Sequence, residues 1–155
     1  MSKSLKRVCA DAEARGLEID PIRLDDGTTT AAMAADAVGA AVGQIVKSVV
    51  LRAVDGDEHV LFLTSGDNQV DLGRASEVAG CALEKADAAS IRAFTGFAIG
   101  GVSPLGHKTP IRTYFDPHLH SFPVVWAAAG TPHHVFRITP DTLARVAGAQ
   151  EAVFT

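Results

Sequence analysis

Two apolar segments joined by a short acidic turn restrict the possible folds of this chain most strongly. Residues 45–54 are rich in β-branched side chains, and residues 60–64 read Val-Leu-Phe-Leu-Thr. Residues 45–54 are apolar on both faces of an extended chain, which is typical of a buried strand. The connecting sequence Asp55-Gly56-Asp57 favours a turn that sends the chain back on itself. We therefore expect these two segments to form a β-hairpin.

The remaining secondary structure is predicted from apolar spacing and from capping residues. Helices are expected over residues 5–16, 31–38, 71–79 and 140–147 and after Asp87, with extended segments over 19–24, 111–115, 124–128 and 135–138. No regular βαβ alternation and no internal repeat is present, which indicates the α+β class. We expect a curled, mixed and largely antiparallel sheet, barrel-like and flanked by helices. The length of the chain fits a single domain, residues 1–155.

Charge and composition exclude several classes of protein. A formal net charge of −4 argues against a protein bound along DNA, but an enzyme that grips only the end of an RNA needs just a few local cations. Uncharged stretches are too short to span a bilayer, and no apolar segment follows the basic N-terminus. We therefore expect no DNA or membrane partner and a cytoplasmic location. Cys9 and Cys81 are far apart and suggest neither a disulfide framework nor a zinc site.

Lys47 interrupts the first strand of the expected hairpin. Its neighbours Ile45, Val49 and Leu51 share its face because side chains alternate along a strand, and all three are apolar. A buried ammonium group is costly unless it is paired or put to use. An ion pair with a buried carboxylate, or an edge strand from which the lysine reaches solvent, would give it a structural role. A functional role is the alternative.

Residues 100–108 form the second unusual segment, Gly-Gly-Val-Ser-Pro-Leu-Gly-His-Lys. Gly100 and Gly101 let the backbone approach a ligand closely and present its amides, while Pro104 stiffens the loop. Such a loop suits a carbonyl oxygen or an oxyanion. A phosphate-binding loop is rejected because His107 interrupts the Gly-Lys pair that it requires. An ordinary irregular turn is the alternative.

The two segments together resemble a known family. Residues 44–50 (Gln-Ile-Val-Lys-Ser-Val-Val), followed by Gly100–Gly106, closely resemble the YbaK-like family of aminoacyl-tRNA deacylases. That family includes the editing domain inserted in bacterial prolyl-tRNA synthetases. The resemblance extends over nearly the whole chain through Asp71-Leu72, Asp116 and Ala129-Gly130. It implies a compact α+β fold that hydrolyses the ester between a mischarged amino acid and the terminal adenosine of tRNA, with no metal and no cofactor.

The resemblance also implies roles for individual residues. Lys47 would anchor the terminal nucleotide or the amino-acid end of the substrate, and Gly100 and Gly101 would present backbone amides to the ester carbonyl. Such donors accelerate acyl transfer because negative charge develops on that oxygen. No side-chain base stands out, so a water molecule aided by the substrate's ribose hydroxyl is the expected nucleophile. The positions expected to bind substrate are Val102, Ser103, Pro104, Gly130 and His134.

The edited amino acid is left open by the sequence. Residues 130–134, near the third part of the family's amino-acid pocket, match no subfamily. His134 could narrow or polarise the pocket, or simply begin a strand. The resemblance implies small residues such as alanine, serine or cysteine, mischarged on proline tRNA. The expected partners are the acceptor end of that tRNA and, in a transient complex, an aminoacyl-tRNA synthetase.

Two other functions remain as alternatives. A metal-dependent hydrolase would use the histidines, since His118 and His120 share a face of an extended chain and His133 and His134 follow nearby. However, no HExxH pattern and no carboxylate at ligand spacing accompanies them. The second alternative is a module that holds a tRNA end or a nucleotide without turnover. An assay with mischarged tRNA separates that module from an enzyme.

Overall fold

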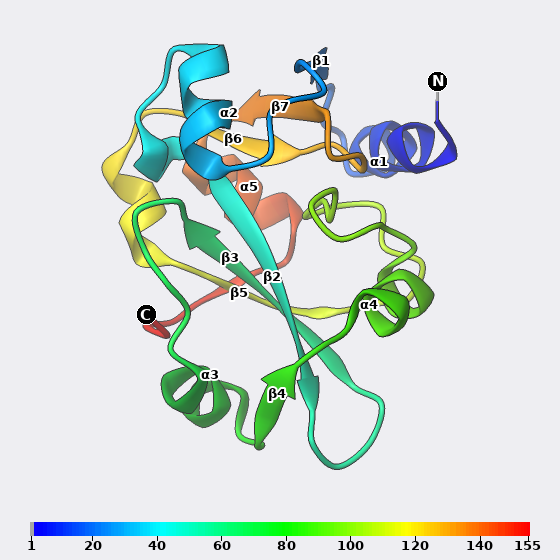
Figure 1. Cartoon of the computed structure of the whole chain (residues 1–155), viewed down its shortest axis with the longest axis vertical. Helices are drawn as coiled ribbons and strands as arrows, with labels where there is room; N and C mark the ends of the chain where they lie inside the picture. The colour runs from blue at the N-terminus through cyan, green and yellow to red at the C-terminus, as the bar shows by residue number, and fades with distance from the viewer. Residues whose placement is uncertain (1) are drawn as a thin grey trace.

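The computed structural model describes residues 2–155 and contains two β-sheets (Figure 1). The larger sheet has the strand order β4-β2-β3-β5-β8, and the smaller has the order β1-β7-β6. A parallel bridge between Ile45 and Trp126 connects the start of β2 to β6. The strands are β1 (Ile22–Arg23), β2 (Val46–Ala53), β3 (His59–Ser65), β4 (Leu83–Lys85), β5 (Arg112–Phe115), β6 (Val125–Ala128), β7 (His134–Ile138) and β8 (Gln150–Glu151).

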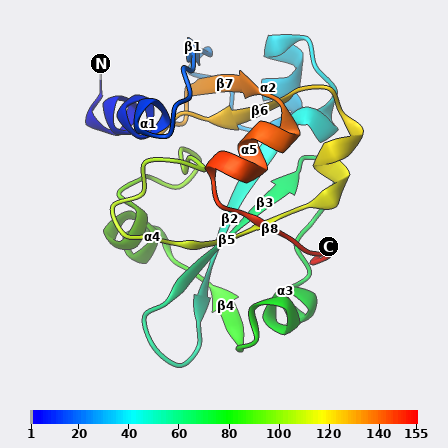
Figure 2. The ribbon, with the colours of Figure 1, turned by 180° about the vertical axis from the view of Figure 1, so that it is seen from behind.

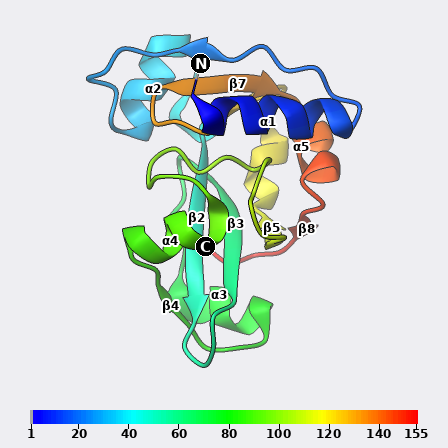
Figure 3. The same ribbon diagram turned by 90° about the vertical axis from the view of Figure 1, so that its right-hand side faces the viewer.

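Each α-helix begins after a Ser, Thr or Asp whose side chain accepts a hydrogen bond from an amide of the first turn. The smaller sheet lies with α1 and α2 across one end of the larger sheet (Figure 3). No helix of residues 2–155 has the length and apolar character of a membrane span. The helices are α1 (Lys3–Ala14), α2 (Ala31–Val38), α3 (Leu72–Ala79), α4 (Ala88–Thr95) and α5 (Pro140–Val146), with 3₁₀ helices η1 (Val42–Gln44) and η2 (Pro117–Ser121).

The predicted hairpin is confirmed and lies inside the larger sheet. Strands β2 and β3 pair antiparallel, from Val46 opposite Ser65 to Arg52 opposite His59. Strand β4 joins β2 antiparallel, whereas β5 joins β3 and β8 joins β5 in parallel. The sheet is therefore mixed, as expected.

The α+β class is confirmed, and the strands are not closed into a barrel. A barrel requires the two edge strands of a sheet to pair with each other. Here β8 has only two residues and β4 only three, so neither edge can support a ladder that closes the sheet. Figure 2 shows β8 beside β5, below α5. The sequence did not predict β4 or β8, because so few residues carry no measurable periodicity.

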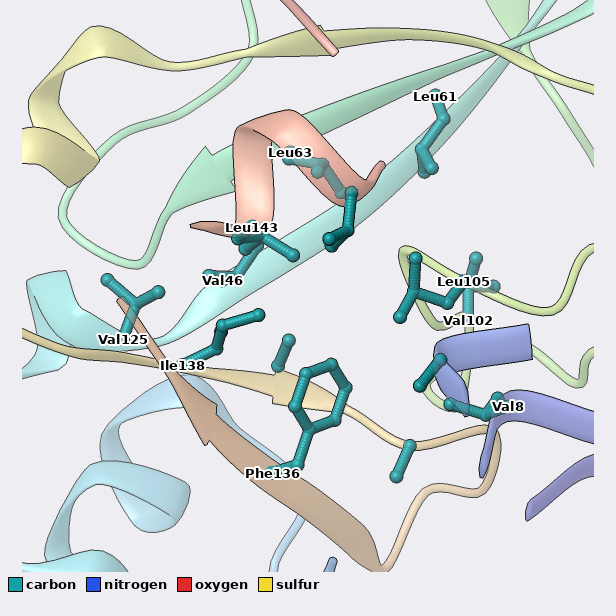
Figure 4. Packing of buried hydrophobic residues seen from close by; sticks show 14 of the residues in the cluster. Val8, Val46, Leu61, Leu63, Val102, Leu105, Val125, Phe136, Ile138 and Leu143 are labelled. Atoms are coloured by element: carbon teal, nitrogen blue, oxygen red, sulfur yellow. The ribbon is translucent and has the colours of Figure 1, made fainter. Parts of the chain in front are cut away.

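Both faces of β3 are covered, which explains its apolar sequence. Leu61 and Leu63 face a core between the sheets, where side chains from α1, α5, β6, β7 and the loop after α4 converge (Figure 4). On the opposite face, the Phe62 ring packs 5.5 Å from that of Tyr114 and 4.9 Å from that of Phe154. Since neither face of β3 meets water, consecutive positions from Val60 to Leu63 are apolar.

Helix α1 holds one end of residues 96–106, here called the glycine loop. Arg7 Nε donates to the Gly106 carbonyl at 2.6 Å, and its guanidinium lies 4.7 Å from the centre of the Phe97 ring. The Gly106 amide in turn donates to Asp11 Oδ2 at 2.8 Å. These contacts fix the loop to a rigid element, so its exposed part has a defined position beside β2.

Candidate active site

A cavity of about 480 Å³, here called the first cavity, opens where the two sheets meet. Its walls are residues 45–48 at the start of β2, residues 28–31 at the N-terminal end of α2, and residues 131–135 leading into β7. Side chains of β6 and the exposed part of the glycine loop complete it. In Figure 1, α2 and β7 lie above the start of β2, while the glycine loop approaches β2 from the side of α4. The site is therefore assembled from segments far apart in the sequence.

Lys47 lines the first cavity and is half-buried. It pairs with Thr64 across the hairpin, and its Nζ donates to the backbone carbonyl of Asn68. Burial holds the pKa of Lys47 below its usual value, and the negative charge of Asp116 partly offsets this effect. Among residues 2–155 Lys47 forms no salt bridge, so the ion pair that would have given it a purely structural role is absent. The ammonium group remains available to a ligand.

Asp116 organises the loop to which Lys47 is bonded. This carboxylate is only 3% exposed. Its Oδ2 accepts from the Ser65 amide at 3.1 Å and from Asn68 Nδ2 at 2.9 Å, and its Oδ1 accepts from the His118 amide at 2.9 Å. Because the Asn68 carbonyl accepts from Lys47, Asp116 positions the lysine through Asn68. Asp116 entered the sequence analysis only as part of the family resemblance.

The glycine loop contains one amide that is bonded within the loop and two that are unpaired. The Gly101 amide donates to the Ala98 carbonyl at 3.0 Å, closing a tight turn. A Cβ on Gly101 would lie 2.7 Å from the carbonyl carbon of Thr131, so this glycine allows two backbones to touch. Gly100, at φ +85°, and Val102 line the cavity, and in residues 2–155 no group accepts from their amides. Gly101 therefore supplies room, whereas Gly100 and Val102 have amides free for a ligand.

Ser103 and Pro104 are buried and do not line the first cavity. The Ser103 hydroxyl accepts from the Leu105 amide at 3.2 Å, and the Ser103 carbonyl accepts from His107 Nε2 at 2.6 Å. Burial lowers the pKa of His107 to about 4, so the imidazole is neutral at pH 7 and Nε2 carries the proton that it donates. Ser103 thus shapes the loop from inside the protein.

His134 and Gly130 occupy different positions relative to the first cavity. His134 lines it, and its Nδ1 lies 2.6 Å from Thr131 Oγ1. Burial holds the pKa of His134 below its usual value, and the positive charge of Arg23 acts in the same direction. Gly130 lies outside the lining, at φ +98°, where a Cβ would sit 2.8 Å from the carbonyl oxygen of Ser4. Gly130 therefore allows this part of the chain to pack closely against the backbone of α1.

Other lining residues carried no functional signal in the sequence. Thr28, Thr29 and Thr30 read as a helix cap, and Thr30 does accept from the Met33 amide, but all three also line the cavity. Trp126 lies half-buried on β6, among residues that read as an ordinary strand. An isolated apolar residue at a surface needs no functional explanation. Only the fold makes these residues neighbours.

Of the histidines considered as metal ligands, His118 and His120 contact carboxylates and His134 contacts Thr131, whereas His133 Nδ1 is buried without a hydrogen-bond partner among residues 2–155. His118 Nε2 lies 3.2 Å from Asp67 Oδ2. His120 Nδ1 lies 2.9 Å from Asp141 Oδ1, and its other ring nitrogen contacts Glu151. Within residues 2–155 no three His, Cys, Asp or Glu side chains are grouped as a metal-ligand set. This arrangement gives no support to a metal-dependent hydrolase.

The fold and the first cavity define a small α+β protein whose site lies at the junction of two sheets. The family model of the aminoacyl-tRNA editing domain matches residues 25–146, so the chain belongs to this family. The resemblance found in the sequence is thereby confirmed. The chain is also 28% identical over 140 residues to the uncharacterized protein YwhH of Bacillus subtilis (strain 168), covering 90% of this chain and 88% of that protein.

Solved structures agree with the family assignment. A structure solved as a candidate trans-editing enzyme for prolyl-tRNA synthetase is 48% identical, covers 98% of this chain and 96% of its own, and superposes with a TM-score of 0.92. The hypothetical protein APE2540 is 27% identical over 94% of this chain and 97% of its own, with a TM-score of 0.85. Lys47 and the glycine loop both lie inside the region that the family model matches.

Proposed function

We propose that this chain is a trans-editing aminoacyl-tRNA deacylase, a single domain that hydrolyses the ester of a mischarged amino acid. One observation carries the proposal: the first cavity combines the ammonium group of Lys47 with the unpaired amides of Gly100 and Val102. Membership of the editing family indicates the substrate class. The cavity supplies a cation for an anionic substrate and donors for a carbonyl oxygen, which are the groups that acyl transfer from RNA requires.

In the proposed reaction, water is the nucleophile and the ribose oxygen is the leaving group. The water oxygen attacks the carbonyl carbon, and its proton passes by way of the neighbouring ribose hydroxyl. The oxyanion that forms accepts hydrogen bonds from the Gly100 and Val102 amides. The bond between the carbonyl carbon and the ribose oxygen then breaks, and that oxygen takes up the proton. Each positioned donor contributes a rate factor of about 10²–10³.

Lys47 has the role of anchor in this proposal. Its charge acts at short range in a partly dry environment, where an ion pair with a phosphate is stronger than in bulk water. The Asn68 carbonyl and the buried Asp116 behind it limit where the ammonium group can go. Lys47 therefore holds the nucleotide so that the ester carbonyl meets the loop amides.

We propose small amino acids, such as alanine, serine or cysteine on proline tRNA, as the residues removed. The cavity must hold the reacting ester as well as the amino-acid side chain, and Trp126, His134 and Thr28 are among the residues that line it. A pocket excludes larger side chains by overlap but rejects smaller ones only weakly. A small pocket would thus spare correctly attached proline and accept the smaller residues.

The proposed partners are the tRNA acceptor end and, transiently, prolyl-tRNA synthetase, in the cytoplasm. A 48% identical structure was solved as a candidate trans-editing enzyme for that synthetase. With a net charge of −4, the chain has no general excess of cations to hold a long RNA. A protein with this net charge can still bind the acceptor end of a tRNA, because that contact needs only a few local cations.

The test is a deacylation assay with one tRNA and several amino acids. Proline tRNA is charged separately with alanine, serine, cysteine and proline, and release of each amino acid is followed against a reaction without protein. We expect rapid release of at least one small residue and little release of proline. Tight binding of all four without release would identify a binding module and refute the deacylase.

A further inference from the structure

The charge of the first cavity bears on the kind of acyl group that it receives. Within residues 2–155, Lys47 is the one Asp, Glu, Lys or Arg that lines this cavity. The rest of the lining consists of apolar side chains, hydroxyl groups of serine and threonine, two histidines and backbone. An amino acid esterified through its carboxyl group keeps its α-amino group, and in the ammonium form that group is a second cation. The cavity therefore offers the ammonium group a like charge and no carboxylate from the described part of the chain.

The surroundings of the cavity disfavour positive charge. Burial holds the pKa of both Lys47 and His134 below the usual values. The Lys47 ammonium group and the unpaired amides of Gly100 and Val102 can donate hydrogen bonds but cannot accept them. An α-ammonium group in this cavity would lose water and would be repelled by Lys47, and both effects cost free energy.

Acylation of the α-amino group removes both costs. The nitrogen becomes a neutral amide, and the carbonyl oxygen of the added group is an acceptor for hydroxyl donors such as that of Thr28, which lines the cavity. A cavity of about 480 Å³ lies within the size range of sites for drug-sized ligands, so an acetyl group can be added to an alanyl group. The acyl group and the amino-acid side chain leave the α-carbon in different directions. Room for the first therefore does not imply room for a larger side chain.

We propose that the first cavity also hydrolyses esters whose acyl group carries no α-ammonium group, in particular N-acylaminoacyl-tRNA. The inference rests on the proposed function, because it uses the same water, loop amides and ribose. The water oxygen bonds to the ester carbonyl carbon, and the bond from that carbon to the ribose oxygen breaks. The ribose oxygen takes up one proton of the water, so the products are an N-acylamino acid and free tRNA. The chain would thereby release blocked as well as mischarged amino acids.

Three acyl groups on one tRNA test the proposal with the natural protein. Proline tRNA is charged with alanine, one portion is acetylated at the amino group, and another is converted by nitrous acid to the lactyl ester, in which a hydroxyl replaces the amino group. The assay is run at about pH 7, where most α-amino groups are protonated. Each kcat/KM is divided by the rate without protein, which corrects for the intrinsic reactivity of the ester.

We expect the N-acetylalanyl and lactyl esters to be accelerated at least as strongly as the alanyl ester. Acceleration of both neutral esters below about one-tenth of that of the alanyl ester would overturn the proposal. Release of the lactyl ester without release of the N-acetylalanyl ester would show that the cavity has no room for the added acyl group, and would overturn it as well.

A matched pair of variants at Thr28 tests the electrostatic cause. Thr28→Asp adds a carboxylate to the lining of the first cavity, and Thr28→Asn adds a neutral group of nearly the same shape. Thr28→Asp should shift the preference toward the alanyl ester at least about tenfold, because the carboxylate pairs with the α-ammonium group. Thr28→Asn should shift it less than about twofold. A ratio between two esters is compared because any effect on Lys47 is common to both. Equal ratios in the two variants would overturn the electrostatic argument.

The same esters separate this proposal from the proposed function. Release of the alanyl ester without release of either neutral ester would overturn the wider substrate class and leave the deacylase standing. Release of none of the three, and of no serine or cysteine ester, would refute the deacylase itself. The comparison of esters uses the natural protein and does not depend on the folding of either Thr28 variant.

Discussion

Lys47 is a half-buried charged residue in the wall of the first cavity. Its Nζ bonds to a backbone carbonyl and not to a carboxylate, so its charge is only partly compensated. Burial lowers its pKa, which means that the protein bears a cost for keeping the ammonium group charged. A cost of this kind without an ion pair is what we expect of a group that awaits a ligand.

We predict that Lys47→Ala reduces deacylation at least tenfold, about 1.4 kcal/mol of transition-state stabilisation. The free energy of unfolding should change by less than about 1 kcal/mol, because the lost hydrogen bond is offset by relief of a desolvated charge. Single-turnover rates and thermal unfolding measure the two effects. Lys108→Ala is the control, since Lys108 is exposed and does not line the first cavity. Full activity of Lys47→Ala would remove this lysine from the site.

Among the structural elements, the glycine loop contains residues with unpaired amides at the first cavity and residues that only maintain the shape of the loop. Its turn uses the Gly101 amide internally, and its buried part is built on Ser103. The loop therefore reaches the first cavity mainly through Ile99, Gly100 and Val102.

We predict opposite outcomes for two substitutions in this loop. Ser103→Ala should retain most of the activity and form no acyl-serine intermediate, because the hydroxyl is buried and already accepts from Leu105. It should cost about 1 kcal/mol of stability for one lost hydrogen bond. Gly101→Val should impair both turnover and folding, since even a Cβ would overlap the Thr131 backbone. Mass spectrometry of the quenched reaction and thermal melting measure these effects, and a trapped acyl-serine would contradict the water mechanism.

The loop is also expected to make the fold sensitive to acid. His107 has a pKa of about 4 in the folded chain, below its usual 6.5, so the unfolded chain takes up the proton first as the pH falls. The contribution of neutral His107 to the free energy of unfolding is complete above pH 6.5 and is lost progressively down to about pH 4. From pH 7 to pH 5 the natural protein should lose about 2 kcal/mol more than His107→Gln, which can still donate to the Ser103 carbonyl. Urea unfolding at both pH values measures this, and equal losses would show that His107 titrates normally.

The charge of the whole protein limits how RNA can bind. The net charge of −4 disfavours an extended phosphate-binding surface.

We predict a shallow salt dependence of RNA binding. Each phosphate neutralised on a single strand contributes a slope of about −0.7 in log K against log salt concentration. With two to four such contacts, the expected slope lies between about −1 and −3. Anisotropy titrations at several salt concentrations measure it. A much steeper slope would reveal a basic surface along the body of the tRNA.

Features that depend on neighbours in the chain could be predicted from the amino-acid sequence alone. The caps at Asp71, Asp87 and Thr139 were predicted, as was the hairpin, because each rests on a side chain and a backbone group a few residues apart. The family was predicted for the same reason, since its lysine strand and glycine loop are contiguous motifs. Lys47, Gly100, Val102 and His134 do line the first cavity.

The surroundings of each site residue depend on contacts that form only in the folded protein. The walls of the first cavity include residues 28–31, 45–48 and 131–135 and the loop residues Ile99, Gly100 and Val102, which meet only after the sheets pack together. The Gly101 amide proved to be engaged and Ser103 to be buried, because both depend on contacts that no local pattern encodes. The sheet stayed open for a similar reason: closure is decided by its edges, and the short strands there are stabilised by packing and not by their own sequence.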